Sequence, residues 1–289
     1  MKTTAVIVSR NDNYGGNLIE RSTYCIQSSI DTYDEVIYVD WNSPTQSLLW
    51  EIQNNIKFKG NLKHIVIPPD TAKQLTNYDP HAQVCNEALG RNIGLRRATG
   101  DWIVSTNIDI IAPRKQDIEN TIKSLDENIF YTISRREVEL STIKEFHNGE
   151  LKYNQYGALR EFLINNSEER HFNETTVTGD DYSIINCCGD YQIAHRNIWN
   201  TIRGMEEDLI YSLYTDTNVQ KKAVMHGFGL KAIYNPAFFH INHGRGGGGF
   251  LDGINRVTND PRRAILEQKE TRNSDTWGFS QIEIEFEVL

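Results

Sequence analysis

The first part of the chain alternates short apolar runs with segments that can form helices, and this alternation constrains the fold more than any other feature. Strands alternating with helices of this length are typical of a parallel sheet with both faces covered. Pro44 suits the first turn of a helix, and Gly100 suits a helix end. We predict strands at residues 4–9, 35–40, 62–67 and 102–106, and helices at residues 18–30, 44–55 and 81–98.

The second part of the chain is less regular. Residues 135–185 are polar and are predicted to form an excursion or mobile loop. The tail at residues 282–288 alternates apolar and acidic side chains, as a half-buried strand would. We also predict strands at residues 191–194 and 231–234, with a helix at residues 216–226 between them.

Composition excludes several classes of protein. The 289 residues carry a net charge of -9, which argues against a nucleic-acid partner but not against a local basic pocket for a nucleotide. No apolar segment is long enough to cross a bilayer, so we expect no integral membrane association. The first apolar run meets Arg10 too early for a secretory signal, and none of the four cysteines has metal-ligand spacing. These features predict a cytoplasmic protein with reduced thiols.

Polar groups follow three of the predicted strands: Ser9-Arg10-Asn11, Asp40-Trp41-Asn42 and Asn107-Ile108-Asp109. Ligands of open α/β sheets bind at the carboxyl ends of the strands, so three such groups predict a binding site at this edge. Asp109 is the candidate metal ligand, because hard divalent cations prefer oxygen and often bridge a protein carboxylate to a substrate diphosphate. The alternative is that Asp109 caps the turn before Pro113.

The helix before Asp109 places Arg91, Asn92 and Arg96 close together. The planar guanidinium of Arg91 can clamp a phosphate group. The alternative is that these arginines form a solvated basic helix face.

The segment from Ala88 to Trp102 reads A-x-x-R-N-x-G-x-x-x-A-x-G-D-W and is followed by an apolar strand and Asn107-Ile108-Asp109. Together with AVIVSRND and YVDWNSP nearer the N-terminus, it resembles the GT-A nucleotide-sugar transferases, especially the broad family 2 type. The resemblance implies a single α/β domain over residues 1–289, with a GT-A-like (Rossmann-like), mostly parallel central sheet flanked by helices. Residues 1–112 would form the nucleotide-binding half, and residues 113–289 a less regular acceptor-binding half and C-terminal tail.

In that family these loops hold the nucleotide part of the donor. Asn107 departs from the family pattern, because it stands where the first carboxylate of a D-x-D motif is expected, and a neutral ligand weakens metal binding. The donor-binding residues that the resemblance implies are Ser9, Arg10, Asn11, Asp40, Asn42, Arg91, Asn92 and Asn107.

Two later segments also resemble the family. CGDYQIAHRNIWNTIRGMEED is similar to the segment that closes the site, which would bring Gly189 and Asp190 near the acceptor. YTDTNVQKKAVMHGFGL is similar to the helix that carries the general base of inverting members, with Asp216 in the matching position. Asp216 could instead cap that helix. Glu206 and Glu207 are the rival catalytic carboxylates, because other GT-A families keep their acid in a Gly-x-Glu-Asp motif.

His240 and His243 precede Gly244, Arg245 and four further glycines. In many GT-A enzymes a histidine after the last core strand completes the site for a divalent metal, Mn²⁺ or Mg²⁺. His243 is the first choice for this ligand and His240 the second. Arg245 and the glycines can wrap a diphosphate through backbone N–H groups. The alternative is a flexible loop with two solvent-exposed histidines.

The resemblance implies a hexosyl- or pentosyltransferase that moves a sugar from a nucleoside diphosphate sugar to a hydroxyl of a glycan or similar acceptor. A UDP-sugar is the first candidate donor and a GDP-sugar the second. One alternative is a nucleotidyltransferase, although such enzymes carry a Gly-rich basic loop directly after the first strand, and here Gly15 and Gly16 come late. The other is a non-catalytic sugar- or nucleotide-binding protein on a decayed transferase fold, with which Asn107 is consistent.

Overall fold

The computed structural model describes residues 1–76, 85–149, 156–169, 176–179, 182–185, 189–207, 215–244 and 273–289. In this part of the chain the main sheet has eight strands in the order β12-β6-β11-β4-β1-β2-β3-β14. Neighbouring strands are parallel except where β11 and β14 pair with their neighbours. The strands are β1 (Thr3–Ser9), β2 (Glu35–Trp41), β3 (Leu62–Ile67), β4 (Trp102–Thr106), β6 (Ile129–Ile133), β11 (Tyr191–His195), β12 (Gly229–Ile233) and β14 (Glu287–Val288).

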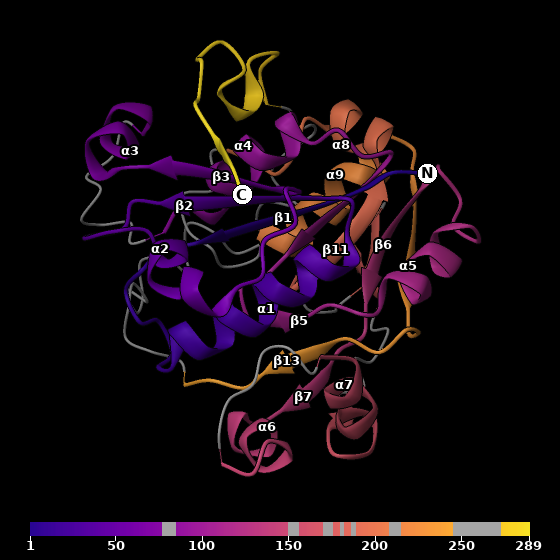
Figure 1. Ribbon diagram of the computed structural model, residues 1–289. Coiled ribbons are helices and arrows are strands. Elements are labelled where there is room, and N and C mark those ends of the chain that lie inside the picture. Colours follow the sequence, from indigo (N-terminus) through magenta and orange to yellow (C-terminus); the bar gives the residue numbers. More distant parts are fainter. Residues whose placement is uncertain are drawn as a thin grey trace.

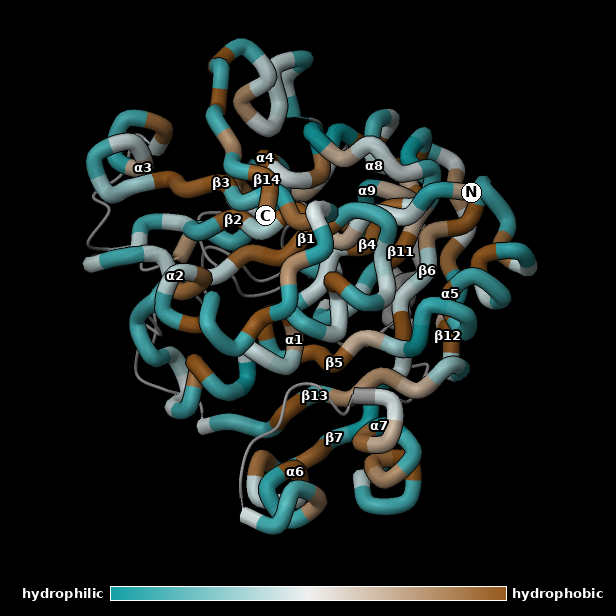
Figure 2. Tube along the Cα trace, viewed as in Figure 1, coloured by the Kyte–Doolittle hydropathy of each residue, from teal (hydrophilic) through white to brown (hydrophobic). Residues whose placement is uncertain are grey.

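Helices cover both faces of the main sheet, and α1 lies in front of it in Figure 1. Side chains of β1 alternate between two apolar cores, since Ala5 and Ile7 pack towards α1 while Val6 and Val8 pack towards α4. Apolar stretches accordingly follow the central strands in Figure 2. The first core involves α1 (Leu18–Thr32), α2 (Leu48–Ile52) with the 3-10 turn η1 (Gln53–Asn55), and α5 (Lys115–Ile122). The second involves α3 (Pro69–Leu75), α4 (Glu87–Arg97), α8 (Arg196–Ile202), α9 (Thr215–Met225) and the 3-10 turn η2 (Trp277–Phe279).

A second, smaller sheet lies below the main sheet in Figure 1 and has the strand order β5-β13-β7-β8. Two helices, α6 and α7, pack against β7 and β13 around a third apolar core. These short strands bring together segments from distant parts of the chain, and this arrangement builds the site described below. Their bounds are β5 (Ile110–Ile111), β7 (Arg136–Val138), β8 (Glu168–Glu169), β13 (Phe239–Ile241), α6 (Leu140–Phe146) and α7 (Tyr156–Asn165), and a separate hairpin joins β9 (Thr176–Gly179) to β10 (Tyr182–Ile185).

The predicted strands of the first part are confirmed, and two predicted helices start later than expected. The helix α4 begins at Glu87 because the side chain of Asn86 caps it, accepting a hydrogen bond of 3.0 Å from the backbone N–H of Leu89. The helix expected from Pro44 begins at Leu48. The residues between form a loop, and Asn11 Nδ2 donates to the carbonyl oxygen of Gln46 in this loop at 3.1 Å.

Two predictions for the second part were wrong. Residues 135–185 were expected to be an irregular excursion, but their described residues include α6, α7 and four short strands. The tail was expected to be a half-buried strand over residues 282–288, but only Glu287–Val288 is a strand and Phe286 is 48% exposed. Of the apolar side chains of the tail, Ile284 packs against the second core, whereas Ile282, Phe286 and Val288 are exposed.

Across the described residues, every helix is too short or too polar to cross a bilayer.

Candidate metal and donor site

Asp109 lies between β4 and β5 and is buried. Its Oδ2 atom accepts a hydrogen bond of 3.1 Å from Arg21 Nη1 and lies 3.1 Å from Nε2 of His243. Its Oδ1 atom lies 3.7 Å from Nε2 of His240 and has no hydrogen-bond partner. An unpartnered buried carboxylate oxygen is costly unless a further partner binds it. The carboxylate is therefore prepared for an additional positive ligand.

The two histidines point their Nε2 atoms at Asp109 because their Nδ1 atoms are engaged elsewhere. His240 lies on β13, and its Nδ1 is 2.7 Å from Oε2 of Glu137. Nδ1 of His243 is 2.9 Å from the carbonyl oxygen of Gly244. Both partners are acceptors, so each Nδ1 carries a proton. Nε2 of His240 is then left with a lone pair, and Nε2 of His243 can exchange its hydrogen bond to Asp109 for a bond to a cation.

The three side chains fit a divalent cation. The candidate ligand atoms of Asp109, His240 and His243 all lie within 4.8 Å of one another. Ligands held about 2.1 Å from one ion lie roughly 3 to 3.5 Å apart, close to the separations seen here. Two imidazoles and one carboxylate suit Mn²⁺ and other first-row transition ions better than Mg²⁺, which prefers oxygen alone. From the sequence, His243 was the first choice of histidine ligand and His240 the second, and both lie in this cluster.

The electrostatics of the cluster keep Asp109 ionised. Burial alone would raise the pKa of Asp109, but the hydrogen bond from His243, the neighbouring His240 and the charge of Arg21 lower it to about 2. Arg21 is itself buried and also donates to the backbone carbonyls of Tyr14 and Gly16. The same guanidinium thus orients the carboxylate and shapes the loop beside it.

Gly15 in that loop packs directly against His243. It has a φ of +69°, and a Cβ atom at this position would overlap the imidazole Nδ1 of His243. Its carbonyl oxygen also accepts a hydrogen bond of 3.1 Å from the N–H of Gly244. Only a residue without a side chain leaves His243 in its observed place.

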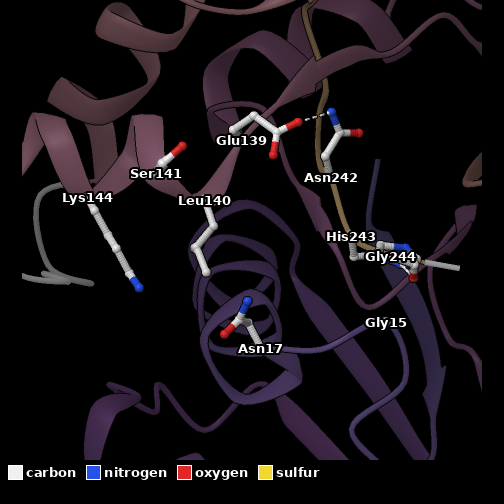
Figure 3. A pocket seen from close by; sticks show the side chains of 9 residues that line it. All are labelled: Gly15, Asn17, Glu139, Leu140, Ser141, Lys144, Asn242, His243 and Gly244. Carbon is white, nitrogen blue, oxygen red and sulfur yellow. Dashed lines mark hydrogen bonds between the residues drawn. The ribbon is translucent and has the colours of Figure 1, made fainter. Parts of the chain in front are cut away.

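A cavity of about 590 Å³ opens on the α6 side of His243 (Figure 3). The side chain of Lys144 extends along this cavity towards Asn17, and Glu139 accepts a hydrogen bond of 2.6 Å from Asn242. Of the three candidate metal ligands, His243 lines this cavity, and Asp109 and His240 do not.

A series of polar contacts joins α4 to the metal cluster. Arg91 donates to Oδ1 of Asn107, whose Nδ2 donates to Oδ1 of Asp190 at 2.8 Å. Arg135 then bridges the other oxygen of Asp190 to Glu137, with 2.7 Å between Arg135 Nη2 and Glu137 Oε1. The structure thus brings together the predicted residues Arg91, Asn107 and Asp190. It adds Arg135 and Glu137, which the sequence prediction missed.

Asp216 lies in the first turn of α9, with its side chain against Gly189. Burial raises the pKa of Asp216, and the negative charge of Glu87 raises it further, while backbone N–H groups of Thr217 and Gly189 oppose the shift. Because Glu87 also pairs with Arg91, Asp216 lies at the α4 end of the polar series. The structure places the two predicted residues Gly189 and Asp216 in contact.

Three other predicted residues make contacts that hold the fold together. Asn92 exchanges two hydrogen bonds of 2.8 Å with the backbone of Met205, and it donates to Oε1 of Glu207 at 3.0 Å. Glu207 also accepts from the N–H of Gly278 at 2.8 Å, which ties the C-terminal segment to α4. Glu206 is buried, with its Oε2 3.8 Å from Nζ of Lys222. We carry none of these three into the proposed site.

The predicted donor residues at the ends of β1 and β2 differ in how far they are buried. Asp40 has no exposed surface, and its Oδ2 accepts from the N–H of Leu48 at 3.3 Å, so we do not include it among the proposed donor contacts. Ser9 is buried as well and bonds the hydroxyl of Tyr38 at 2.6 Å.

Arg10 and Asn11 are half-buried at the rim of the sheet, and they hold the loop that begins at Asn42. Asn42 itself is buried and has a φ of 57°. The predicted donor residue Arg245 lies outside the described residues.

The sheet order, its flanking helices and the small second sheet, which carries His240 next to Asp109, define a GT-A-like fold. No family model matches the chain, and no protein of curated description is significantly similar to it.

Solved structures of S. aureus TarS are similar to it. TarS 1–349 matches with a TM-score of 0.50 and 18% identity, over 83% of this chain and 60% of that chain. The same region in complex with UDP-GlcNAc matches with a TM-score of 0.48 and 15% identity, over 84% of this chain and 59% of that chain. At this level of identity, the first match supports the fold alone. The chain spans 60% of the length of that TarS chain.

Proposed function

We propose that the chain is a metal-assisted glycosyltransferase that moves a hexosyl or pentosyl group from a nucleoside diphosphate sugar to an acceptor hydroxyl. The observation that carries the proposal is the Asp109, His240 and His243 cluster at the carboxyl end of β4, with the buried guanidinium of Arg21 bonded to Asp109. A divalent ion held there would supply positive charge to the leaving diphosphate. The GT-A-like fold, which the match to TarS supports, is compatible with this activity.

In this proposal the chain's own residues divide the work. Asn107 lies nearest the diphosphate and the buried Arg91 holds Asn107 in place, while Arg10, Asn11 and Asn42 line the nucleotide side of the site. Asp190 and Gly189 face the acceptor. The donor would be a UDP-sugar first and a GDP-sugar second, and the acceptor a hydroxyl of a glycan or a similar molecule.

Asp216 is the proposed general base for an inverting transfer. A base must lie within hydrogen-bond reach of the acceptor hydroxyl and works best when its pKa is raised towards the working pH. The raised pKa of Asp216 and its contact with Gly189 support this role over capping alone.

We further propose that residues 1–289 act as one domain in the cytoplasm. The pairing of β4 with β11, and of β11 with β6, supports one unit because it joins strands from both halves into a single sheet.

The test is a thermal-shift and hydrolysis screen of UDP-, GDP- and dTDP-sugars with and without Mn²⁺, on the wild type and on Asp109→Asn. We expect one nucleotide class to stabilise the wild type only with Mn²⁺ present, and to be hydrolysed slowly. Asp101→Asn is the control, because Asp101 is a carboxylate beside the opposite end of the same strand, β4. A lack of any shift with all three classes would overturn the proposal and favour a non-catalytic protein.

A further inference from the structure

Glu137 lies directly beside His240 in the small sheet. The two residues are register partners in the parallel pairing of β7 with β13. Their side chains are 10% and 8% exposed, and Oε2 of Glu137 is 2.7 Å from Nδ1 of His240. This buried contact lies on the side of the imidazole away from Asp109.

A carboxylate at Nδ1 controls what the other ring nitrogen can do. A neutral imidazole carries one proton, and an anionic acceptor at Nδ1 holds that proton there. Nε2 is then left as a lone-pair donor, and in this structure it faces the unpartnered Oδ1 of Asp109 at 3.7 Å. The carboxylate also makes the ring more electron-rich, which strengthens a bond from Nε2 to a cation.

Glu137 is itself fixed in place. Its second oxygen is 2.7 Å from Arg135 Nη2, and Arg135 also pairs with Asp190. The carboxylate therefore cannot turn away from His240 without giving up a contact with a guanidinium that is itself almost buried. A pair held from both sides fixes the ring angle as well as the tautomer.

We propose that Glu137 is the positioning residue of His240 and sets the affinity of the Asp109 cluster for a divalent transition cation, with Arg135 holding Glu137 in register. This inference rests on the metal site of the proposed function. It assigns the role to two residues that contact neither donor nor acceptor in that proposal.

The test is a titration of the purified, metal-free full chain with Mn²⁺. Binding is measured by calorimetry and by the electron paramagnetic resonance signal of free Mn²⁺. We expect Glu137→Gln to weaken Mn²⁺ binding about 10-fold and Glu137→Ala up to about 100-fold. Glu168→Gln is the matched control, because Glu168 is the exposed register partner of Glu137 on β8. It should leave the affinity within about twofold.

A second measurement does not depend on a metal. Nitrogen-15 NMR of the metal-free chain, with labelled histidine, should show His240 as the Nδ1–H tautomer in the wild type and in Glu168→Gln. A mixture of tautomers is expected in Glu137→Gln, because an amide can either accept from Nδ1 or donate to it. Circular dichroism checks that each variant is folded, and the isosteric Gln variant decides the outcome if the Ala variant does not fold.

The outcomes separate the two proposals. Normal Mn²⁺ binding by the wild type, with unchanged affinity in Glu137→Gln, would overturn the role of Glu137 and leave the metal site standing. An Nε2–H tautomer in the wild type would also overturn it. If the wild type binds no Mn²⁺, the metal site and the inference built on it both fail. Binding of a nucleoside diphosphate sugar without metal would then still support the donor class of the proposed function.

Discussion

Two carboxylates at the same edge of the sheet have opposite environments. Asp109 is surrounded by His240, His243 and Arg21, which lower its pKa to about 2 despite its burial. Asp216 is half-buried, and its pKa is raised by burial and by the negative charge of Glu87. One group is held as an anion, whereas the other is disposed to take up a proton.

This difference assigns the roles within the proposed reaction. A permanent anion suits a cation ligand, and a carboxylate with a raised pKa suits proton transfer. Variants that act on one carboxylate should therefore separate metal binding from turnover, and the following experiments test whether they do.

The largest effect is expected for Asp109→Ala. It removes the one anionic ligand and leaves Arg21 as a buried charge without its carboxylate partner, so Mn²⁺ binding and turnover should both fall by about 10³-fold or more. Calorimetry and donor hydrolysis measure the two losses. Full turnover in a folded Asp109→Ala protein would contradict the assignment, and Asp101→Asn should behave as the wild type.

Asp216→Asn should lower kcat by about 10²- to 10⁴-fold while donor and Mn²⁺ affinities stay nearly unchanged. The amide keeps the shape and the helix-end contacts but cannot accept the acceptor proton. Steady-state kinetics and donor titration measure the split. The matched control is Asp117→Asn, which changes a carboxylate in the first turn of the comparable helix α5. Equal losses of kcat and donor affinity would indicate a structural role for Asp216.

A glycine substitution next to His243 should weaken metal binding less than the loss of Asp109 does. Gly15→Ala should weaken Mn²⁺ binding about 10-fold, because the new Cβ would push His243 away from Asp109. Gly16→Ala is the control, since Gly16 also has a positive φ, of +77°, but its Cβ would meet nothing within 4 Å. Both variants share the backbone cost, of about 1 kcal/mol, so only the difference between them reports on His243.

On the Asp216 side the equivalent variant is Gly189→Ala. Its Cβ would overlap the side chain of Asp216, so we expect kcat to fall about 10-fold with Mn²⁺ affinity unchanged. Gly157→Ala, where a Cβ would meet nothing within 4 Å, should have no effect on either quantity. A fall in Mn²⁺ affinity in Gly189→Ala would show that the two carboxylates are not independent.

The smallest effect is expected for Glu87→Gln. Activity through Asp216 requires its deprotonated form, so kcat/KM should fall as pH drops through the raised pKa of this group. Removing the negative charge of Glu87 lowers that pKa, and the acid limb of the pH profile should move to lower pH by a fraction of one unit. Gln116→Glu on the exposed face of α5 is a charge-changing control. An unmoved acid limb would contradict the assignment of that limb to Asp216.

Much of the fold and part of the site could be predicted from local sequence patterns. The strands β1 to β4 and the helix α9 follow from apolar runs and periodicity, because each element is long enough to show a pattern of its own. The strand ends indicated Asn107 and Asp109 at the carboxyl edge of the sheet, and the helix before them indicated Arg91, which the structure places against Asn107.

The small sheet could not be predicted in the same way. Its strands have only two or three residues each, and they pair across distant parts of the chain, so they leave no periodic signal. Glu137 was missed for this reason, since it lies in the polar stretch read as a loop. The alternation in Arg136-Glu137-Val138 was the one local sign of a strand there.

The backbone N–H of Ile241 donates to the carbonyl oxygen of Asp109 at 2.9 Å. This bond joins β13, which lies far along the chain, to a segment that is synthesised much earlier. During synthesis the N-terminal portion of a chain leaves the ribosome first. Asp109 and Arg21 therefore emerge as a charge pair long before His240 and His243 exist. The metal cluster would then be complete only after β13 and His243 have been made, and a nascent or truncated product ending before β13 would lack both histidines.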